Sequence, residues 1–485
     1  MKLIYNIDAK PKEMGYGQTL LFALQQLLAI LAATILVPMI VGNGMSTAAA
    51  LFGAGIGTLV YQLFTRFRSP VFLGSSFAFI SSMCAAFGGA ASAQAGFLGI
   101  IIGAILAGLV YVVIALIVRT AGSAWIDKLM PAAIIGPTVA IIGLSLANNA
   151  VQNSIGAYKG YAVWRDTNNL NSFVMSGKGL IYLAIALITL FTVVICAVNN
   201  KKMIKLIPFV IGIGVGYAIA LILSLIGKGA DVEMLKIIDF DAFKNPDWKP
   251  DFTFLHAFKG FKDLTPSFFG TVAVAYIPVA FVVFAEHIAD HKNLSSIVDK
   301  NLLDDPGLDK TLLGDGVGSM VGAFFGGCPN TTYGESIGCV AISRVASVWT
   351  VTCAAVMAIV FSFIAPFVTF LSLIPQCVMG GVCIALYGFI AVSGLKMLQK
   401  VDLSDNKNLF TVSTILIAGV GSMSLTFGEF DELGNGKHVT LTAVACALIL
   451  GIVVRLIVTS KFFNREDNAA SEDEPAEVAA ESEDK

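Results

Sequence analysis

The segment Phe52-Gly-Ala-Gly-Ile-Gly-Thr-Leu-Val60 recurs as Leu313-Gly-Asp-Gly-Val-Gly-Ser-Met-Val321, and this pair decides the predicted fold. A second pair, Leu129-Met-Pro-Ala-Ala-Ile-Ile-Gly136 and Leu373-Ile-Pro-Gln-Cys-Val-Met-Gly380, follows in the same order. The partners lie seven apolar stretches apart, an odd number, so the two copies would enter a membrane in opposite directions. Inverted repeats are typical of secondary transporters, whose binding sites lie near the bilayer midplane. Chance similarity between glycine-rich segments is the alternative, and two matches in one order disfavour it.

The composition around these repeats is that of a membrane protein. Of the 485 residues, 56% are hydrophobic and only 13% are charged, whereas a soluble domain carries about 25% charge. We predict an all-α polytopic membrane protein of about 14 transmembrane segments, arranged as two inverted repeats of seven. The apolar stretches lie near residues 17–41, 46–65, 71–90, 94–118, 129–148, 179–199, 203–227, 265–289, 311–327, 331–343, 346–370, 373–396, 408–427 and 437–459.

Polar segments divide the chain and orient it. Lys and Arg gather in the loops that follow even-numbered stretches, as at Arg66 and Arg68, while the short loops on the other side carry neither. By the positive-inside rule both termini are expected in the cytoplasm, with the protein in a bacterial plasma (inner) membrane. The predicted organisation is a cytoplasmic tail (1–16), a first repeat (17–227), a polar extracellular connection (228–264), a second repeat (265–460) and an acidic, disordered cytoplasmic tail (461–485).

Stretches three and ten are predicted to be interrupted. They contain Gly74-Ser-Ser-Phe-Ala-Phe79 and Pro329-Asn-Thr-Thr-Tyr-Gly334-Glu335, in which Pro329 and Gly334 disfavour a continuous helix. Irregular backbone survives at membrane depth only where protein or an aqueous cavity satisfies it. We therefore predict short, broken strand/helix segments here, with the binding site between them.

Four acidic residues in apolar stretches are the candidates for chemistry. Glu286 and Asp290 are four residues apart and share one helix face, while Glu335 follows the break in stretch ten. A buried carboxyl group can exchange a proton near neutral pH, and a carboxylate accepts N–H donors well. Asp290 has a solvated helix face as its alternative interpretation. Asp315, the fourth candidate, could instead cap a helix or form a gating hydrogen bond.

Other site types are weighed against this interpretation. Glu286-His-Ile-Ala-Asp-His291 contains a His-x-x-x-His spacing, yet no further histidine or cysteine cluster completes a metal shell. We expect no metal, no cofactor, no enzymatic activity and no nucleic acid partner, and we place His291 at the membrane interface. Gly53-Ala-Gly-Ile-Gly57 lies in an apolar span without a flanking strand, which disfavours a dinucleotide loop. For Gln25 and Gln26, structural and substrate-binding roles remain open.

Five motifs stand out along the chain: Leu24-Gln-Gln-Leu-Leu-Ala-Ile-Leu-Ala-Ala-Thr-Ile-Leu-Val-Pro38, Gly74-Ser-Ser-Phe-Ala-Phe-Ile80, Ala285-Glu-His-Ile288, Asp305-Pro-Gly-Leu308 and Pro329-Asn-Thr-Thr-Tyr-Gly-Glu-Ser-Ile-Gly338. In this order they resemble the nucleobase–ascorbate transporter family, and most of all its bacterial uracil permease branch. The resemblance covers residues 17 to 460.

The resemblance implies uptake of uracil together with a proton. It implies a core domain (17–118 plus 265–370), a gate domain (129–227 plus 373–459) and a homodimer formed through the gate domains. Glu286 and Glu335 would hold the ring, and Glu286, with Asp290 and Asp315, would serve proton coupling. The remaining implied substrate contacts are backbone groups around Phe77 and Gly334 and the side chains of Ala33, Phe77, Tyr333 and Tyr387.

Three positions depart from the family pattern. Asp290 stands where uracil permeases resemble one another in having histidine and where purine-type relatives often have aspartate. Gln26 and Ser336 replace a histidine and an asparagine. A xanthine or urate permease therefore remains the alternative, although Glu335 is the pyrimidine-type residue. An anion carrier of related architecture is a further alternative, but it would favour Lys or Arg in the broken segments, and neither segment has one.

Overall fold

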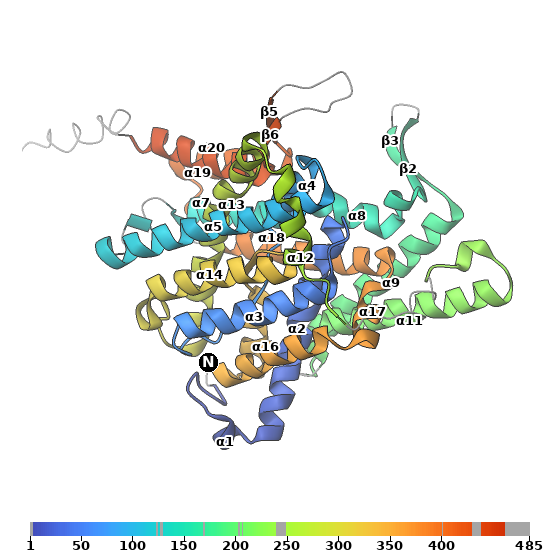
Figure 1. Ribbon diagram of the computed structural model, residues 1–485, viewed down its shortest axis with the longest axis horizontal. Coiled ribbons are helices and arrows are strands. Elements are labelled where there is room, and N and C mark those ends of the chain that lie inside the picture. The colour runs from blue at the N-terminus through green and yellow to red at the C-terminus, as the bar shows by residue number, and fades with distance from the viewer. Residues whose placement is uncertain are drawn as a thin grey trace, which may run out of the picture.

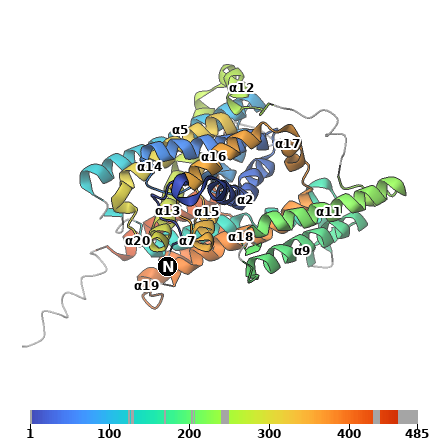
Figure 2. The same cartoon turned by 90° about the horizontal axis from the view of Figure 1, so that it is seen from below.

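The computed structural model describes residues 3–122, 125–126, 130–167, 170–201, 204–205, 207–238, 249–399, 401–428 and 438–460. The predicted disordered tail, 461–485, lies outside these residues. The described chain is mostly helical, and its long helices pack along and across one another (Figures 1 and 2). It also contains three two-stranded sheets, so the fold is not purely α-helical.

The first half of the chain contains α1 (Pro11–Met14), α2 (Tyr16–Val41), α3 (Thr47–Phe64), β1 (Leu73–Ser75), α4 (Ile80–Gly88), α5 (Ala93–Ala121), α7 (Ala132–Ser145), α8 (Ala147–Ile155), β2 (Ala162–Thr167), β3 (Leu170–Met175), α9 (Gly177–Val198) and α11 (Pro208–Gly229). The second half contains α12 (Thr253–Ala257), α13 (Pro266–Val298), α14 (Leu308–Gly326), β4 (Asn330–Thr332), α15 (Gly334–Ser343), α16 (Val348–Ser362), α17 (Ala365–Ser372), α18 (Gln376–Leu398), α19 (Asn406–Val420), β5 (Leu425–Gly428), β6 (His438–Leu441) and α20 (Ala443–Val458).

Many of these helices are long and apolar enough to cross a membrane. Among the described residues eight helical spans meet that criterion, and α16 with α17 make a ninth if the bent pair counts as one. The chain is therefore a multi-pass membrane protein, while the number of 14 segments stays a prediction. The eight spans are Tyr16–Val41, Thr47–Phe64, Ala93–Ala121, Ala132–Ile155, Gly177–Val198, Pro208–Gly229, Pro266–Val298 and Gln376–Leu398.

Three predicted stretches differ from the structure. The stretch 346–370, predicted as continuous, is split into α16 and α17, which meet at 86°. Pro366 lies in the first turn of α17, where its missing N–H costs no helical hydrogen bond, so the chain restarts there after the bend. Stretches 408–427 and 437–459 each include a strand, β5 and β6, which pair with each other as an antiparallel sheet.

The two predicted interruptions are present as strand–helix segments. Strand β1 precedes the short helix α4, and strand β4 precedes the short helix α15. The strands pair antiparallel with Leu73 opposite Thr332, Gly74 opposite Thr331 and Ser75 opposite Asn330. All six residues are buried. Each strand thus satisfies the other's backbone inside the protein, as irregular segments at membrane depth require.

The partners of both sequence matches pack directly on each other. Helix α3 lies along α14, and α7 lies along α18. Glycines allow the close approach of α3 and α14, because a Cβ on Gly53 would lie 2.6 Å from the carbonyl oxygen of Gly322. Helices α9 and α11 pack together beside α18, away from α3 and α14 (Figure 2).

Candidate binding site between the broken segments

One cavity lies where the two strand–helix segments meet α7, α13 and α18. It contains about 600 Å³ of space free of protein atoms, part of it open to solvent. Its walls combine acidic, hydroxyl and apolar side chains. They are formed by Phe77, Val139, Glu286, Ala289, Asp290, Thr331, Thr332, Tyr333, Gly334, Glu335, Phe389, Ile390, Ser393 and Met397.

The local structure brings three carboxyl groups to this cavity. Glu286 and Asp290 lie one helical turn apart on α13, on the face that the cavity exposes. Glu335 lies in the first turn of α15, which begins at Gly334 directly after β4. A helix N-terminus has unpaired N–H groups and favours negative charge, so the break that ends β4 also creates a suitable position for this acid.

Hydrogen bonds from the strand pair hold two of the lining residues. The Thr332 hydroxyl donates to Asp290 Oδ2 at 2.6 Å. The Tyr333 hydroxyl donates to the carbonyl oxygen of Ser75 at 2.8 Å, which fastens β4 to β1. Strand pairing therefore sets the orientation of one acid and one ring of the cavity.

Most of the predicted substrate residues converge here. Glu286, Glu335, Phe77, Gly334 and Tyr333 all line the cavity, and so does Asp290, predicted for proton coupling.

Three predicted residues do not line the cavity. Tyr387 lies behind the wall, with its ring edge-on to Phe77 at 5.8 Å, and Ala33 is buried in α2. Asp315 is almost fully buried on α14, where its Oδ2 lies 2.7 Å from Nδ1 of His287. Its Oδ1 has no hydrogen-bond partner among the described residues, and a separate small cavity lies beside it, next to Tyr111 and Asn330.

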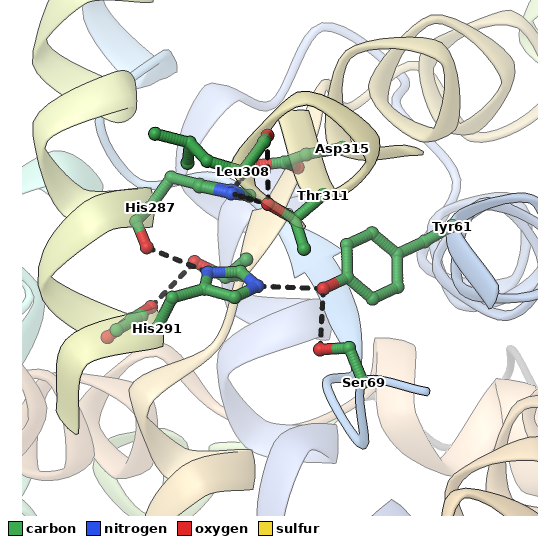
Figure 3. A network of polar contacts seen from close by, with 9 residues as sticks. Tyr61, Ser69, His287, His291, Leu308, Thr311 and Asp315 are labelled. Carbon is green, nitrogen blue, oxygen red and sulfur yellow. Dashed lines mark hydrogen bonds and ion pairs between the residues drawn. The ribbon is translucent and has the colours of Figure 1, made fainter. Parts of the chain in front are cut away.

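His291 was predicted at the membrane interface; its depth in the membrane stays a prediction, but its side chain does not face outward. The side chain is fully buried, with Nδ1 2.8 Å from the carbonyl oxygen of His287 and Nε2 2.8 Å from the Tyr61 hydroxyl. Helix α13 continues to Val298 and carries His291 along a face that packs toward α3 and α14 (Figure 3). A run of apolar residues that ends near 289 does not reveal this continuation.

The structure shows what Gln26 contacts. Its amide nitrogen donates to the carbonyl oxygen of Ser336 at 3.2 Å and contacts the Ser336 hydroxyl. The pair therefore joins α2 to α15 directly behind Glu335.

Sequence reasoning missed one whole wall of the cavity. Phe389, Ser393 and Met397 lie at intervals of four residues on α18 and therefore share one helix face. That spacing was visible in the sequence. It could not be distinguished from a face packed against protein, because both patterns contain mainly apolar residues.

Known proteins are similar to this chain over most of its length. A model of the permease family matches residues 17–427. The uracil permease of Bacillus subtilis is 39% identical over 440 residues, covering 90% of this chain and 91% of that protein. That of Bacillus caldolyticus is 38% identical over 464 residues, covering 95% and 96%. That of Escherichia coli K12 is 34% identical over 442 residues, covering 91% of each.

Solved transporter structures share the fold. The transmembrane domain of the cyanobacterial bicarbonate transporter BicA matches with a TM-score of 0.57 at 15% identity, covering 94% of this chain and 98% of that one. The murine anion transporter Slc26a9, in its inward-facing state, matches with a TM-score of 0.59 at 10% identity, covering 91% and 68%. At these identities the likeness shows the fold alone. The match to the family model and the uracil permease relatives show more: this chain belongs to the permease family and is a transporter rather than an enzyme.

Proposed function

We propose that this protein imports a nucleobase, uracil, together with a proton. The observation that carries the proposal is the meeting of Glu286, Asp290 and Glu335 at one cavity beside the paired strands. The relatives described as uracil permeases support the same substrate.

The cavity offers what a pyrimidine ring needs. Uracil is flat and has two N–H donors and two carbonyl acceptors. Carboxylates of Glu286 and Glu335 are strong acceptors for the N–H groups. Backbone N–H groups at the start of α15, around Gly334, are donors for a carbonyl oxygen. The ring of Phe77 supplies an apolar face for stacking.

Three carboxyl groups in one small cavity also account for proton coupling. Like charges held close together outside bulk water repel, so protonation of one of them favours a closed, occupied site. We assign this proton to Glu286, with Asp290 as its neighbour and Asp315 as a deeper acid. None of the residues that line the cavity is Lys or Arg. This disfavours an anion carrier despite the shared fold.

Transport then requires the walls of the cavity to separate. Glu286 and Glu335 belong to the predicted core domain, whereas Val139 and Ser393 belong to the predicted gate domain. We propose that the core moves against the gate to expose the cavity to each side in turn, as inverted-repeat transporters do. We further propose a homodimer through the gate domains, with both termini in the cytoplasm and the protein in the plasma membrane.

The test is uptake of labelled uracil by bacteria that lack their own nucleobase carriers. We expect saturable uptake that collapses with a protonophore and resists excess xanthine. Competition by xanthine tests the alternative that this protein is a purine permease, which the aspartate at position 290 suggested. Saturable xanthine uptake without uracil uptake would contradict the substrate assignment.

Glu286→Gln tests the proton carrier directly. The amide keeps the size of the side chain but cannot take up a proton, so uptake driven by a pH gradient should be lost. Glu233→Gln, which changes an exposed acid in the polar connection 228–264, is the matched control and should transport normally. Full gradient-driven uptake by Glu286→Gln would contradict the assigned role.

A further inference from the structure

A buried polar cluster lies beside the binding cavity but is separate from it. It joins α3, α13 and α14 through Tyr61, His291, His287 and Asp315, all of which are at most 1% exposed. Figure 3 shows the two imidazoles lying between Tyr61 and Asp315. None of these four side chains lines the cavity that holds Glu286 and Glu335.

Hydrogen bonds around His287 set where protons can lie in one half of the cluster. The Thr311 hydroxyl donates to the carbonyl oxygen of Leu308 at 3.1 Å and lies 3.1 Å from Nε2 of His287. While this hydroxyl donates to Leu308, it accepts from Nε2, and a second proton lies in the 2.7 Å contact between Nδ1 of His287 and Oδ2 of Asp315. In this arrangement the pair is neutral overall, whether the second proton resides on the imidazole or on the carboxyl group.

The other half of the cluster is built to accept a proton. A carbonyl oxygen only accepts, so Nδ1 of His291 donates to the His287 carbonyl, and Nε2 keeps its lone pair. The Tyr61 hydroxyl lies 2.8 Å from Nε2 and donates to the Ser69 hydroxyl, also at 2.8 Å. Rotation of the Tyr61 hydroxyl lets it donate to Nε2 instead while that nitrogen has its lone pair. When Nε2 gains a proton, it donates to Tyr61, and Tyr61 donates to Ser69.

Because the two imidazoles are stacked, only one of them can carry a positive charge at a time. Their ring centroids are 4.0 Å apart with an angle of 27° between the planes, so two positive charges there would repel strongly. Tyr111 on α5 faces His287 edge-on at 6.2 Å and is neutral. Tyr61 from α3 and Asp315 from α14 are the other titratable groups in contact with the stack. Glu286 and Asp290 on α13 itself, and Glu335 on α15, line the neighbouring cavity instead.

We propose that His291, backed by Tyr61 and Ser69, is a second proton station that receives the proton leaving the Asp315–His287 pair. The inference rests on the proposed proton coupling. One N–H bond breaks on the imidazolium form of His287, which leaves a neutral imidazole beside the Asp315 carboxylate, and one N–H bond forms at Nε2 of His291. The rings are stacked rather than hydrogen-bonded, so one ring must turn for the transfer.

The station leads toward one face of the protein. Ser69 is buried, but it follows the exposed residues Arg66 and Arg68 in the loop after α3. On the exposed side of this loop, Lys300 and Arg68 both bind Asp305, and these contacts lower the pKa of its carboxyl group. The proton thus moves from the middle of the protein toward the loop that the positive-inside rule places in the cytoplasm.

The experiment compares Tyr61→Phe with wild type in liposomes loaded with purified protein. Net uracil uptake driven by a pH gradient requires proton release on every cycle, whereas uracil exchange at equal pH on both sides does not. Losing a hydrogen bond to a charged imidazole should slow net uptake about tenfold. Exchange should stay near the wild-type rate. Ser69→Ala should change net uptake in the same direction.

Tyr276→Phe is the matched control. It also removes a fully buried hydroxyl, this one on α13 itself, but that hydroxyl has no hydrogen-bond partner among the described residues. It should leave both rates unchanged. Net uptake at the wild-type rate by Tyr61→Phe would overturn the proton station, and so would an equal loss of exchange and net uptake, which would mean a structural role. Absence of gradient-driven uptake in the wild-type protein would instead overturn the proposed function, and the station with it.

Discussion

Asp290 owes its position to a residue on a different element. Its carboxylate accepts the Thr332 hydroxyl at 2.6 Å, and Thr332 is fixed by its register opposite Leu73 in the strand pair. A short hydrogen bond to a charged acceptor is roughly twice as strong as one between neutral groups. The strand pair therefore orients an acid on α13 as well as satisfying its own backbone.

Thr332→Val tests this link. Valine keeps the shape of threonine and its preference for strands, but it leaves Asp290 without the hydroxyl donor. The free energy of unfolding in detergent should fall by about 1–3 kcal/mol. Thr331→Val is the control, because the Thr331 hydroxyl is buried without a hydrogen-bond partner in the described part of the chain. Equal effects of the two substitutions, measured by thermal or denaturant unfolding, would show that the Asp290 contact contributes nothing.

Single residues also show how far sequence reasoning reaches. Glu286 and Glu335 were predicted to face one cavity because acids in apolar stretches are rare, and the structure places them there. The contact between Asp315 and His287 was not predicted. Helical spacing shows which residues share a face with His287, but it cannot show which other helix that face meets.

At the scale of elements, interruptions were predictable where the sequence marks them strongly. Pro329 and Gly334 mark the strand–helix break in stretch ten, and the structure has β4 and α15 there. The bend between α16 and α17 was missed although Pro366 lies at it, because the flanking residues are apolar enough for one continuous span. The β5–β6 pair was missed for a related reason: its strands extend apolar helical stretches, so hydropathy alone does not separate them.

Helix packing gives the prediction at this scale. A methyl group on Gly53 would lie 2.6 Å from the backbone oxygen of Gly322 on α14, and backbone cannot turn aside as a side chain can. Gly53→Ala should therefore push α3 away from α14 and lower stability by about 1–3 kcal/mol. Unfolding of the purified protein by heat or denaturant measures the change.

Gly270→Ala is the matched control for this substitution. Gly270 also lies within a long helix, but its added methyl group would have no neighbour within 4 Å. Alanine there should be neutral or stabilising by about 0.5–1 kcal/mol, because glycine loses more backbone freedom on folding. If Gly270→Ala lowered the free energy of unfolding as much as Gly53→Ala does, close packing of α3 on α14 would not be the cause of the loss in Gly53→Ala.

At the scale of the whole molecule, transport depends on which parts move relative to one another. The cavity has one wall from the predicted core and one from the predicted gate, so transport by relative movement needs their contacts to change. One such contact lies away from the cavity: Ile207, just before α11 in the predicted gate, packs against Ala29 and Cys339 in the predicted core. Cys339 is a free cysteine, which provides half of a covalent link.

Ile207→Cys uses this contact to test relative movement. Oxidation should join the new cysteine to Cys339, fix core and gate in one arrangement and stop uracil uptake, and a reducing agent should restore it. Mass spectrometry of digested protein identifies the bond. The control carries Ile207→Cys together with Cys339→Ser, which cannot form this link and should respond to neither reagent. Neither residue lines the cavity, so the link itself does not block substrate binding. A linked protein that still transports at the full rate would therefore show that core and gate do not move apart at this contact.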